Sequence, residues 1–151
     1  FSSDMVLQTD GLTQLVNRLG YEHYLARLRV PATILMFDVD RFKDVNDCHG
    51  HLMGDACLRT IAGCIRRAYG NYGTCFRIGG DEFCVILTRR NAQYNTMTEI
   101  FQHLMDAARA ENPVLPMVSV GCSHFNPSTD ELADSLARAD ARMYQNKEAH
   151  R

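Results

Sequence analysis

The chain has 151 residues, of which 46% are hydrophobic and 23% are charged, and its formal net charge is -2. A chain of this length buries a core as one soluble globular domain without disulfides or metals as staples. The slightly negative charge excludes nucleic-acid binding driven by charge alone, because Lys and Arg are not in excess. No apolar run has the length of a membrane-spanning helix, and no signal peptide is visible.

The six cysteines include no Cys-x-x-Cys pair, which argues against a zinc site or a disulfide framework. We expect buried, reduced thiols, and these fit a cytoplasmic location. The first residue is Phe1 rather than Met, which indicates a piece of a longer protein. Any membrane contact would then come through parts of that parent protein.

Apolar periodicity and turn residues predict helices and strands in alternation along the chain. In chain order they are a helix over 14–29, a strand over 32–39, a helix over 54–69, strands over 74–78 and 82–88, a helix over 95–110, a strand over 117–125 and a helix over 131–150. A loop or short helical turn is expected between the first strand and the second helix. Pro31 ends the first helix, and Gly79-Gly80 has the spacing of a tight hairpin.

This order predicts an α+β fold, an α/β sandwich with a central antiparallel sheet surrounded by helices. Its ferredoxin-like βαββαβ core is a split βαβ arrangement, in which the helices of the unit pack on one face. One domain is expected, without internal repeats.

Acidic residues stand where two of the predicted strands end or begin. Asp38 ends the first strand, and Asp81 and Glu82 begin the second arm of the hairpin. In this topology the first strand and the hairpin can be neighbours, and two carboxylates at neighbouring strand ends repel each other unless a cation lies between them. Mg²⁺ takes one or two carboxylates plus substrate phosphates. We therefore expect Mg²⁺ or Mn²⁺ on Asp38, Asp81 and the Val39 carbonyl; solvated strand ends are the alternative.

The segment after the first strand offers groups for phosphates. Backbone amides of residues 41–43 could cradle terminal phosphates as a helix N-terminus does, and Lys43 could add a point charge. Asp40 alternates onto the same face as Asp38. We interpret Asp40 as a salt-bridge partner of Arg41 or Lys43 rather than as a ligand of a second metal.

Asn46 and Asp55 offer an amide and a carboxylate separated by one tight loop. The Watson–Crick edge of guanine presents N–H donors beside an acceptor, which suits this pair, whereas adenine would set its own ring acceptor against Asp55. The alternative is an ordinary helix cap at Asp55. We interpret His51 as a hydrogen bonder that orders this loop.

Lys147 and Arg151 are spaced i, i+4 on the last predicted helix. They either complement the negative end of that helix or clamp a triphosphate tail, and composition does not decide between the two. His150, between them, looks incidental.

Four segments together resemble the GGDEF family of diguanylate cyclases: "DGLTQLVNR", "FDVDRFKDVNDCHGHLMGD", "RIGGDEF" and "ADARMYQNK". The resemblance covers residues 10–151 and leaves 1–9 as a linker remnant. It implies a palm-like fold and the condensation of two GTP into cyclic di-GMP and two pyrophosphates. A hydroxyl and a phosphate held on different molecules imply two half-sites, so a homodimer would be needed.

The resemblance also implies roles for individual positions. Asp81, Glu82 and Lys43 would be catalytic; Asp38, Val39 and Asp81 would hold Mg²⁺ or Mn²⁺; and Asn46, Asp55, His51, Arg41, Phe42, Lys147 and Arg151 would bind GTP. The hairpin glycines would let the nucleotide approach the backbone.

The chain departs from the family pattern in three places. Gln14 replaces a Gly in the opening motif, and His150 replaces a Gly near the end, which bears on the aim of Arg151. Residues 70–73 read "GNYG" where an Arg-x-x-Asp product-inhibition motif is expected, so we expect no inhibitory site for cyclic di-GMP there. Two other functions stay open: a non-catalytic GTP-sensing or interaction domain, and a cyclase that makes a mixed purine dinucleotide.

Overall fold

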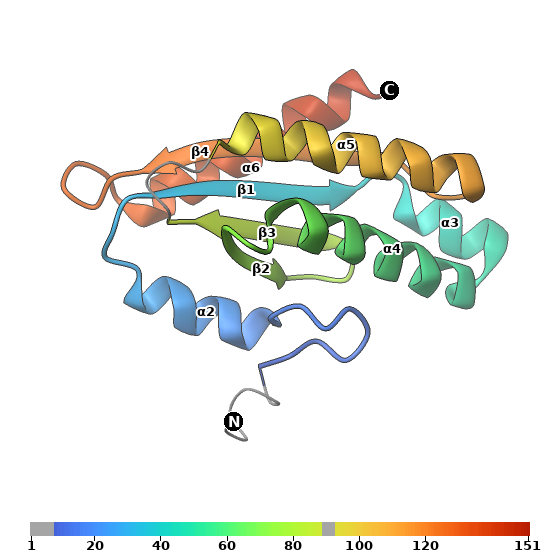
Figure 1. Ribbon diagram of the computed structural model, residues 1–151, viewed down its shortest axis with the longest axis horizontal. Helices are drawn as coiled ribbons and strands as arrows, with labels where there is room; N and C mark the ends of the chain where they lie inside the picture. The colour runs from blue at the N-terminus through green and yellow to red at the C-terminus, as the bar shows by residue number, and fades with distance from the viewer. Residues whose placement is uncertain (1–7, 89–92) are drawn as a thin grey trace.

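The computed structural model describes residues 8–88 and 93–151 (Figure 1). Within these ranges the elements are α2 (Arg18–Arg27), β1 (Ala32–Val39), α3 (Phe42–His49), α4 (His51–Tyr69), β2 (Gly73–Arg77), β3 (Glu82–Leu87), α5 (Tyr94–Glu111), β4 (Val118–Phe125) and α6 (Leu132–Ala149). None of the described helices is both long enough and apolar enough to serve as a membrane span.

The four strands form one antiparallel sheet in the order β2-β3-β1-β4. Strand β1 lies in the interior of the sheet, between β3 and β4, and therefore reads as a nearly continuous apolar run. The predicted α+β class and the βαββαβ core are confirmed. The outer edge of β2 is covered by residues near Val16, whose amide donates to the Cys75 carbonyl over 3.1 Å.

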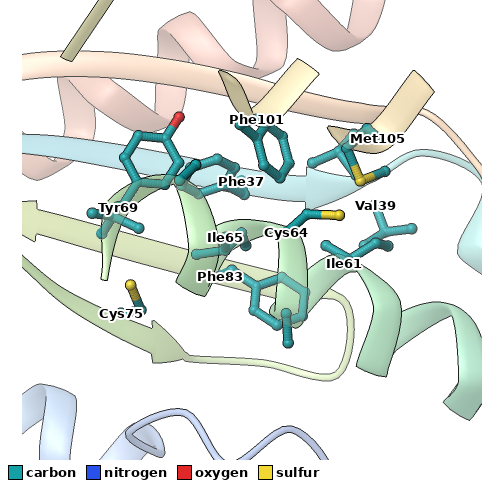
Figure 2. Packing of buried hydrophobic residues seen from close by; sticks show 14 of the residues in the cluster. Phe37, Val39, Ile61, Cys64, Ile65, Tyr69, Cys75, Phe83, Phe101 and Met105 are labelled. Carbon is teal, nitrogen blue, oxygen red and sulfur yellow. The ribbon is translucent and has the colours of Figure 1, made fainter. Parts of the chain in front are cut away.

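One face of the sheet packs against α4 and α5, the two crossover helices of the core unit (Figure 1). Alternation along β1 sends Phe37 to this face, where its ring meets Tyr69 and Phe101 edge-on, with centroids 5.7 and 5.3 Å away. In the view of Figure 2 these three rings lie side by side above Ile65 and Phe83. The prediction that the helices of the unit share one face is confirmed.

The opposite face is covered by α2 and α6, which flank the core unit in sequence. Gly121 of β4 lets α6 approach closely, because a Cβ at this position would lie 2.1 Å from the Ala139 carbonyl oxygen and from the Met143 amide nitrogen. Ile34 and Met36 of β1 point to this side. By the same alternation Asp38 also points toward α6 rather than toward α4.

Two predicted boundaries were wrong. The first helix begins at Arg18 instead of residue 14, because Gln14 has a left-handed φ of 65° and Val16 bridges to Thr9 and Phe76. The segment expected as a loop or turn after β1 contains the two-turn helix α3, and α4 begins at His51 rather than at residue 54. Residues 1–7 of the predicted linker lie outside the described residues.

All six cysteines lie within the described residues and are free. Four of them are buried, as expected, whereas Cys48 is exposed and Cys122 is partly exposed. Burial raises the pKa of the Cys75 thiol to about 12 and that of the Cys122 thiol to about 11. These two thiols therefore stay protonated at neutral pH, and such groups are inert.

We expect the substitution Gln14→Gly to stabilise the protein. A left-handed conformation costs an L-residue about 1–2 kcal/mol, and the extra chain entropy of glycine offsets about half of this. The free energy of unfolding, measured by urea denaturation, should rise by about 0.5–1 kcal/mol. Gln102→Gly, in the interior of α5, is the matched control and should destabilise by about 1 kcal/mol. A loss of stability in Gln14→Gly would contradict the assignment of strain to this turn.

Candidate functional site

The candidate site forms where the C-terminal end of β1 meets the loop that joins β2 to β3 (Figure 1). Asp38 is the register partner of Glu82 in β3, and the Val39 amide donates to the Asp81 carbonyl over 3.0 Å. The predicted approach of these acids across the sheet is therefore confirmed, although more than 40 residues separate them in sequence.

Negative charge is concentrated around Asp38, whose side chain is 18% exposed. Lys147 of α6 donates to Asp38 Oδ2 over 2.6 Å, while Asp38 Oδ1 is buried and has no hydrogen-bond partner among the described residues. Burial and then the charge of Asp38 raise the pKa of the Asp81 carboxyl. Burial, Asp38 and Asp81 together raise the pKa of Glu82. These carboxylates are thus short of positive charge.

Lys147 is the cation that the fold itself supplies to these acids. Burial alone would lower the pKa of Lys147, but its hydrogen bond to Asp38 and the charges of Asp38, Asp40 and Asp81 outweigh burial and raise it. Lys147 therefore stays charged at neutral pH. Sequence spacing predicted a role for Lys147 but not this partner.

The structure requires a glycine at only one of the two hairpin positions, 79 and 80. A Cβ on Gly79 would lie 2.8 Å from Glu82 Oε1, so this glycine makes room for the Glu82 side chain. A Cβ on Gly80 would meet nothing within 4 Å, and neither glycine has a left-handed φ. The turn itself therefore does not require glycine at position 80.

Arg77 ties this loop to the opening turn of the domain. Its guanidinium donates to both carboxylate oxygens of Asp10 over 3.2 Å and to the Gly80 carbonyl over 2.8 Å. Asp10 also accepts from the Thr13 amide and hydroxyl. Burial would raise the pKa of Asp10, but the hydrogen bonds from Thr13 and Arg77 hold it below its usual value. Arg77 therefore supports the loop that carries Asp81.

The predicted guanine pair lies where α3 packs on α4. A Cβ on Gly54 would lie 1.9 Å from Asn46 Oδ1 and 3.2 Å from the Phe42 ring, so only glycine admits Asn46 here. Asn46 is thereby placed beside the residue that precedes Asp55. The helix-cap alternative for Asp55 is wrong, because α4 begins at His51 with Gly50 as its N-cap.

A cavity of about 830 Å³ lies beside the end of β1, and Lys147, the partner of Asp38, is in its lining. Asp38, Asp81 and Asn46 themselves are outside this lining. Its walls come from the end of β1, from α3, from the segment between α5 and β4 and from the end of α6. The lining residues are Asp40, Arg41, Asp44, Val45, Cys48, His49, Pro113, Val114, Pro116, Met117, Lys147, His150 and Arg151. Three of them, Arg41, Lys147 and Arg151, carry permanent positive charge.

The N-terminus of α3 borders this cavity through Arg41. Arg41 is the N-cap of α3, has a left-handed φ of 54° and provides no side-chain cap. The first amides of a helix have no acceptor within the helix, so those of Phe42 and Lys43 can receive an anion. The Lys43 side chain itself is 89% exposed and pairs with Asp47 over 3.3 Å.

Three sequence-based interpretations were wrong. Asp40 pairs with Ser119 and His150 instead of Arg41 or Lys43. His51 is exposed at the start of α4, and no hydrogen bond of its ring is seen within the described residues, so it does not order the loop. His150, taken as incidental, is a polar partner in the site. The signal in the sequence was its place in the family motif, where His150 replaces a Gly next to Arg151.

The donor set suits a hard divalent cation. Asp38 and Asp81 offer carboxylate oxygens, and Mg²⁺ prefers oxygen ligands while keeping waters or substrate phosphates on its other positions. In residues 8–88 and 93–151 no three His, Cys, Asp or Glu side chains gather as a ready-made metal cluster. A cation here would therefore need a main-chain oxygen or a ligand phosphate as well.

We expect Asp81→Asn to stabilise the metal-free protein at neutral pH. The raised pKa means that Asp81 favours the folded state when protonated, and this contribution is lost as pH rises through the folded pKa. Removing the charge should raise the melting temperature on the order of 2 °C in chelating buffer at pH 7. Asp134→Asn, which removes a favourable charge from the first turn of α6, should not raise it. A lower melting temperature for Asp81→Asn would contradict the repulsion.

We expect Arg77→Met to destabilise the protein by about 1–3 kcal/mol at pH 7, because Asp10 loses its charged partner and the Gly80 carbonyl loses the Arg77 donor. Since the pKa of Asp10 is lowered, its contribution is present above its unfolded value of 3.8 and is lost as pH falls through the folded value. Urea denaturation should therefore show a difference from the parent that shrinks on acidification to about pH 3. Arg59→Met, at an exposed site on α4, is the control. A difference that does not depend on pH would contradict the ion pair.

Comparison with known proteins places the chain in a family. The family model described as "Diguanylate cyclase, GGDEF domain" matches residues 7–151. An uncharacterized 19.3 kDa protein of Streptomyces ambofaciens is 36% identical over 144 residues, which cover 91% of this chain and 77% of that protein. A diguanylate cyclase of Vibrio cholerae is 32% identical over 154 residues, which cover 92% of this chain and 46% of that protein. The chain thus spans less than half of the latter relative.

Solved structures agree with this match. The GGDEF domain of DgcB from Caulobacter crescentus, whose crystal structure is a complex with c-di-GMP, has a TM-score of 0.80 at 28% identity. The alignment covers 95% of this chain and 92% of that chain. The motifs, the family match over residues 7–151 and the fold of the solved structure all agree, and the chain belongs to the GGDEF domain family of diguanylate cyclases.

Proposed function

We propose that this domain condenses two GTP into cyclic di-GMP and two pyrophosphates. The observation that carries the proposal is the buried, unpartnered Asp38 Oδ1 beside Asp81 and Glu82, two carboxyls whose pKa values are raised. Such an arrangement costs stability and is explained by a cation that arrives with the substrate. The relatives named diguanylate cyclase support this reading.

The cofactor would be Mg²⁺ or Mn²⁺, held by Asp38, Asp81 and the Val39 carbonyl. A bound divalent metal polarises an α-phosphate and lowers the pKa of an attacking 3′-hydroxyl. Glu82 adds negative charge beside these ligands. Lys147 pairs with Asp38 and also lines the cavity, so it would bring positive charge to a bound phosphate.

GTP would lie with its base near α3 and α4 and its phosphates toward the cavity. Asn46 and Asp55 supply the acceptor and donor pattern that guanine needs. Arg41, Lys147 and Arg151 line the cavity and bring positive charge to the triphosphate. The amides of Phe42 and Lys43 at the N-terminus of α3 add uncharged donors. The Lys43 side chain would have to leave Asp47 to contribute.

The reaction would need two copies of the domain. One domain holds one GTP, and the 3′-hydroxyl of that GTP must reach the α-phosphate of a second one in line with the departing pyrophosphate. Such a reaction asks the protein mainly for positioning and charge stabilisation. A homodimer with facing sites provides both.

The test is turnover by the full-length protein in its dimeric form. With GTP and Mg²⁺ or Mn²⁺, mass analysis should show cyclic di-GMP, and Asp38→Asn and Asp81→Asn should each lower kcat by about 10²–10³. Glu99→Gln, at an exposed site on α5, should leave kcat unchanged. Adding ATP in competition shows whether a mixed purine dinucleotide forms. GTP binding without any product from a verified dimer would instead favour a silent GTP-binding regulatory domain.

A further inference from the structure

Three polar side chains that lie far apart in the sequence meet just beyond the ends of β1 and α6. Ser119 of β4 donates from Oγ to Asp40 Oδ1 over 2.6 Å, and His150 Nδ1 lies 2.5 Å from Asp40 Oδ2. His150 Nδ1 is also 3.2 Å from Ser119 Oγ. Asp40 is 8% exposed and Ser119 is fully buried. Both oxygens of a buried carboxylate are thus satisfied, one of them by His150.

This contact is the second of two that join the end of α6 to the end of β1. Lys147 reaches Asp38, and three residues later His150 reaches Asp40, two residues further along the same face. The helix ends at Ala149, and the chain continues in a turn held by backbone bonds from the amides of residues 150 and 151. His150 therefore anchors the part of the chain that lies beyond the helix.

The direction of the Arg151 side chain depends most on the contact between His150 and Asp40. It lies outside α6, and its guanidinium pairs with Glu148 over 3.5 Å at an exposed position. Ion pairs at exposed positions contribute little to stability, so this pair does not hold the Arg151 side chain in place. Arg151 and Lys147 both line the 830 Å³ cavity, with His150 between them. Without a side chain at position 150, this turn would keep only its local backbone bonds.

The arrangement does not suit two other roles. Ser119, Asp40 and His150 have the residue types of a hydrolytic triad, but in a triad the imidazole presents different nitrogens to Ser and Asp. Here both partners lie at Nδ1, and Ser119 is fully buried in β4. A metal ligand role is also unsupported, because the described residues contain no cluster of three metal-ligating side chains.

We propose that His150 is a positioning residue for nucleotide binding: its bond to Asp40 holds the last turn of the chain so that Lys147 and Arg151 face the cavity. The triphosphate as occupant of that cavity rests on the function proposed above. The anchoring of the turn does not, since the Asp40 contact exists without any ligand.

The experiment compares His150→Ala, His150→Asn and His150→Gln in the full-length protein. Asn can place an amide donor near the position of Nδ1, whereas Gln places it farther out. With GTP and Mg²⁺ we expect Ala and Gln to raise KM about five- to tenfold, with a smaller change in kcat, because a binding group is misplaced in the ground and transition states alike. Asn should restore most of the affinity. His103→Ala, an exposed histidine on α5, is the matched control.

Direct binding of a non-hydrolysable GTP analogue, measured by calorimetry, should follow the same order. Equal affinity in the parent and in all three variants would overturn the proposal, and so would Asn and Gln variants that behave alike. If the Ala variant fails to fold, the comparison of nucleotide affinity between the Asn and Gln variants tests the proposal.

Amide hydrogen exchange of residues 147–151 separates this proposal from the proposed function. If the parent binds no nucleotide, the proposed function fails, and the anchor is then judged by exchange alone. Faster exchange in the Ala and Gln variants, with protection restored in Asn, supports the anchor. Unchanged exchange overturns it.

Discussion

The architecture of the site depends on one electrostatic constraint, the burial of Asp38 beside two other carboxylates. Antiparallel pairing of β1 with β3 sets Asp38 opposite Glu82 and brings the backbone of Asp81 against Val39. Charges this close repel each other when they are removed from water. Lys147 relieves part of the repulsion from one side, whereas Asp38 Oδ1 is left without a hydrogen-bond partner among the described residues.

Helix α6 supplies that positive charge, and its position is set by its packing on β4. Gly121 removes the side chain that would hold α6 away from β4, and Asn146 accepts from the Val120 amide at the open edge of this strand over 2.8 Å. These contacts fix how closely α6 approaches the sheet and where it lies along β4. Lys147, within the helix, then reaches Asp38. His150, in the turn that follows the helix, reaches Asp40. The packing of one helix thus aligns Lys147 and His150 with Asp38 and Asp40.

Much of the fold was predictable because its signals are local. The apolar run at 32–39 matches β1 exactly in its bounds, and the helical stripes located α4, α5 and α6 within a few residues. The start of α2 was not predictable, because the left-handed Gln14 and the bridge from Val16 to Phe76 depend on contacts across the sheet. The cap interpretation of Asp55 failed for a related reason: α3 and α4 meet at Gly50, so α4 begins earlier.

By itself, the sequence determined the order of the elements, the family and the residues that carry charge, since periodicity and motif spacing are properties of neighbouring residues. Tertiary structure alone decided which side chains pair with Asp38 and Asp40. Lys147 and Asp38 are 109 positions apart, and His150 and Asp40 are 110 apart. Pairs at such separations form only after the sheet has closed and α6 has packed on it, because nothing in the local chain directs one side chain toward the other.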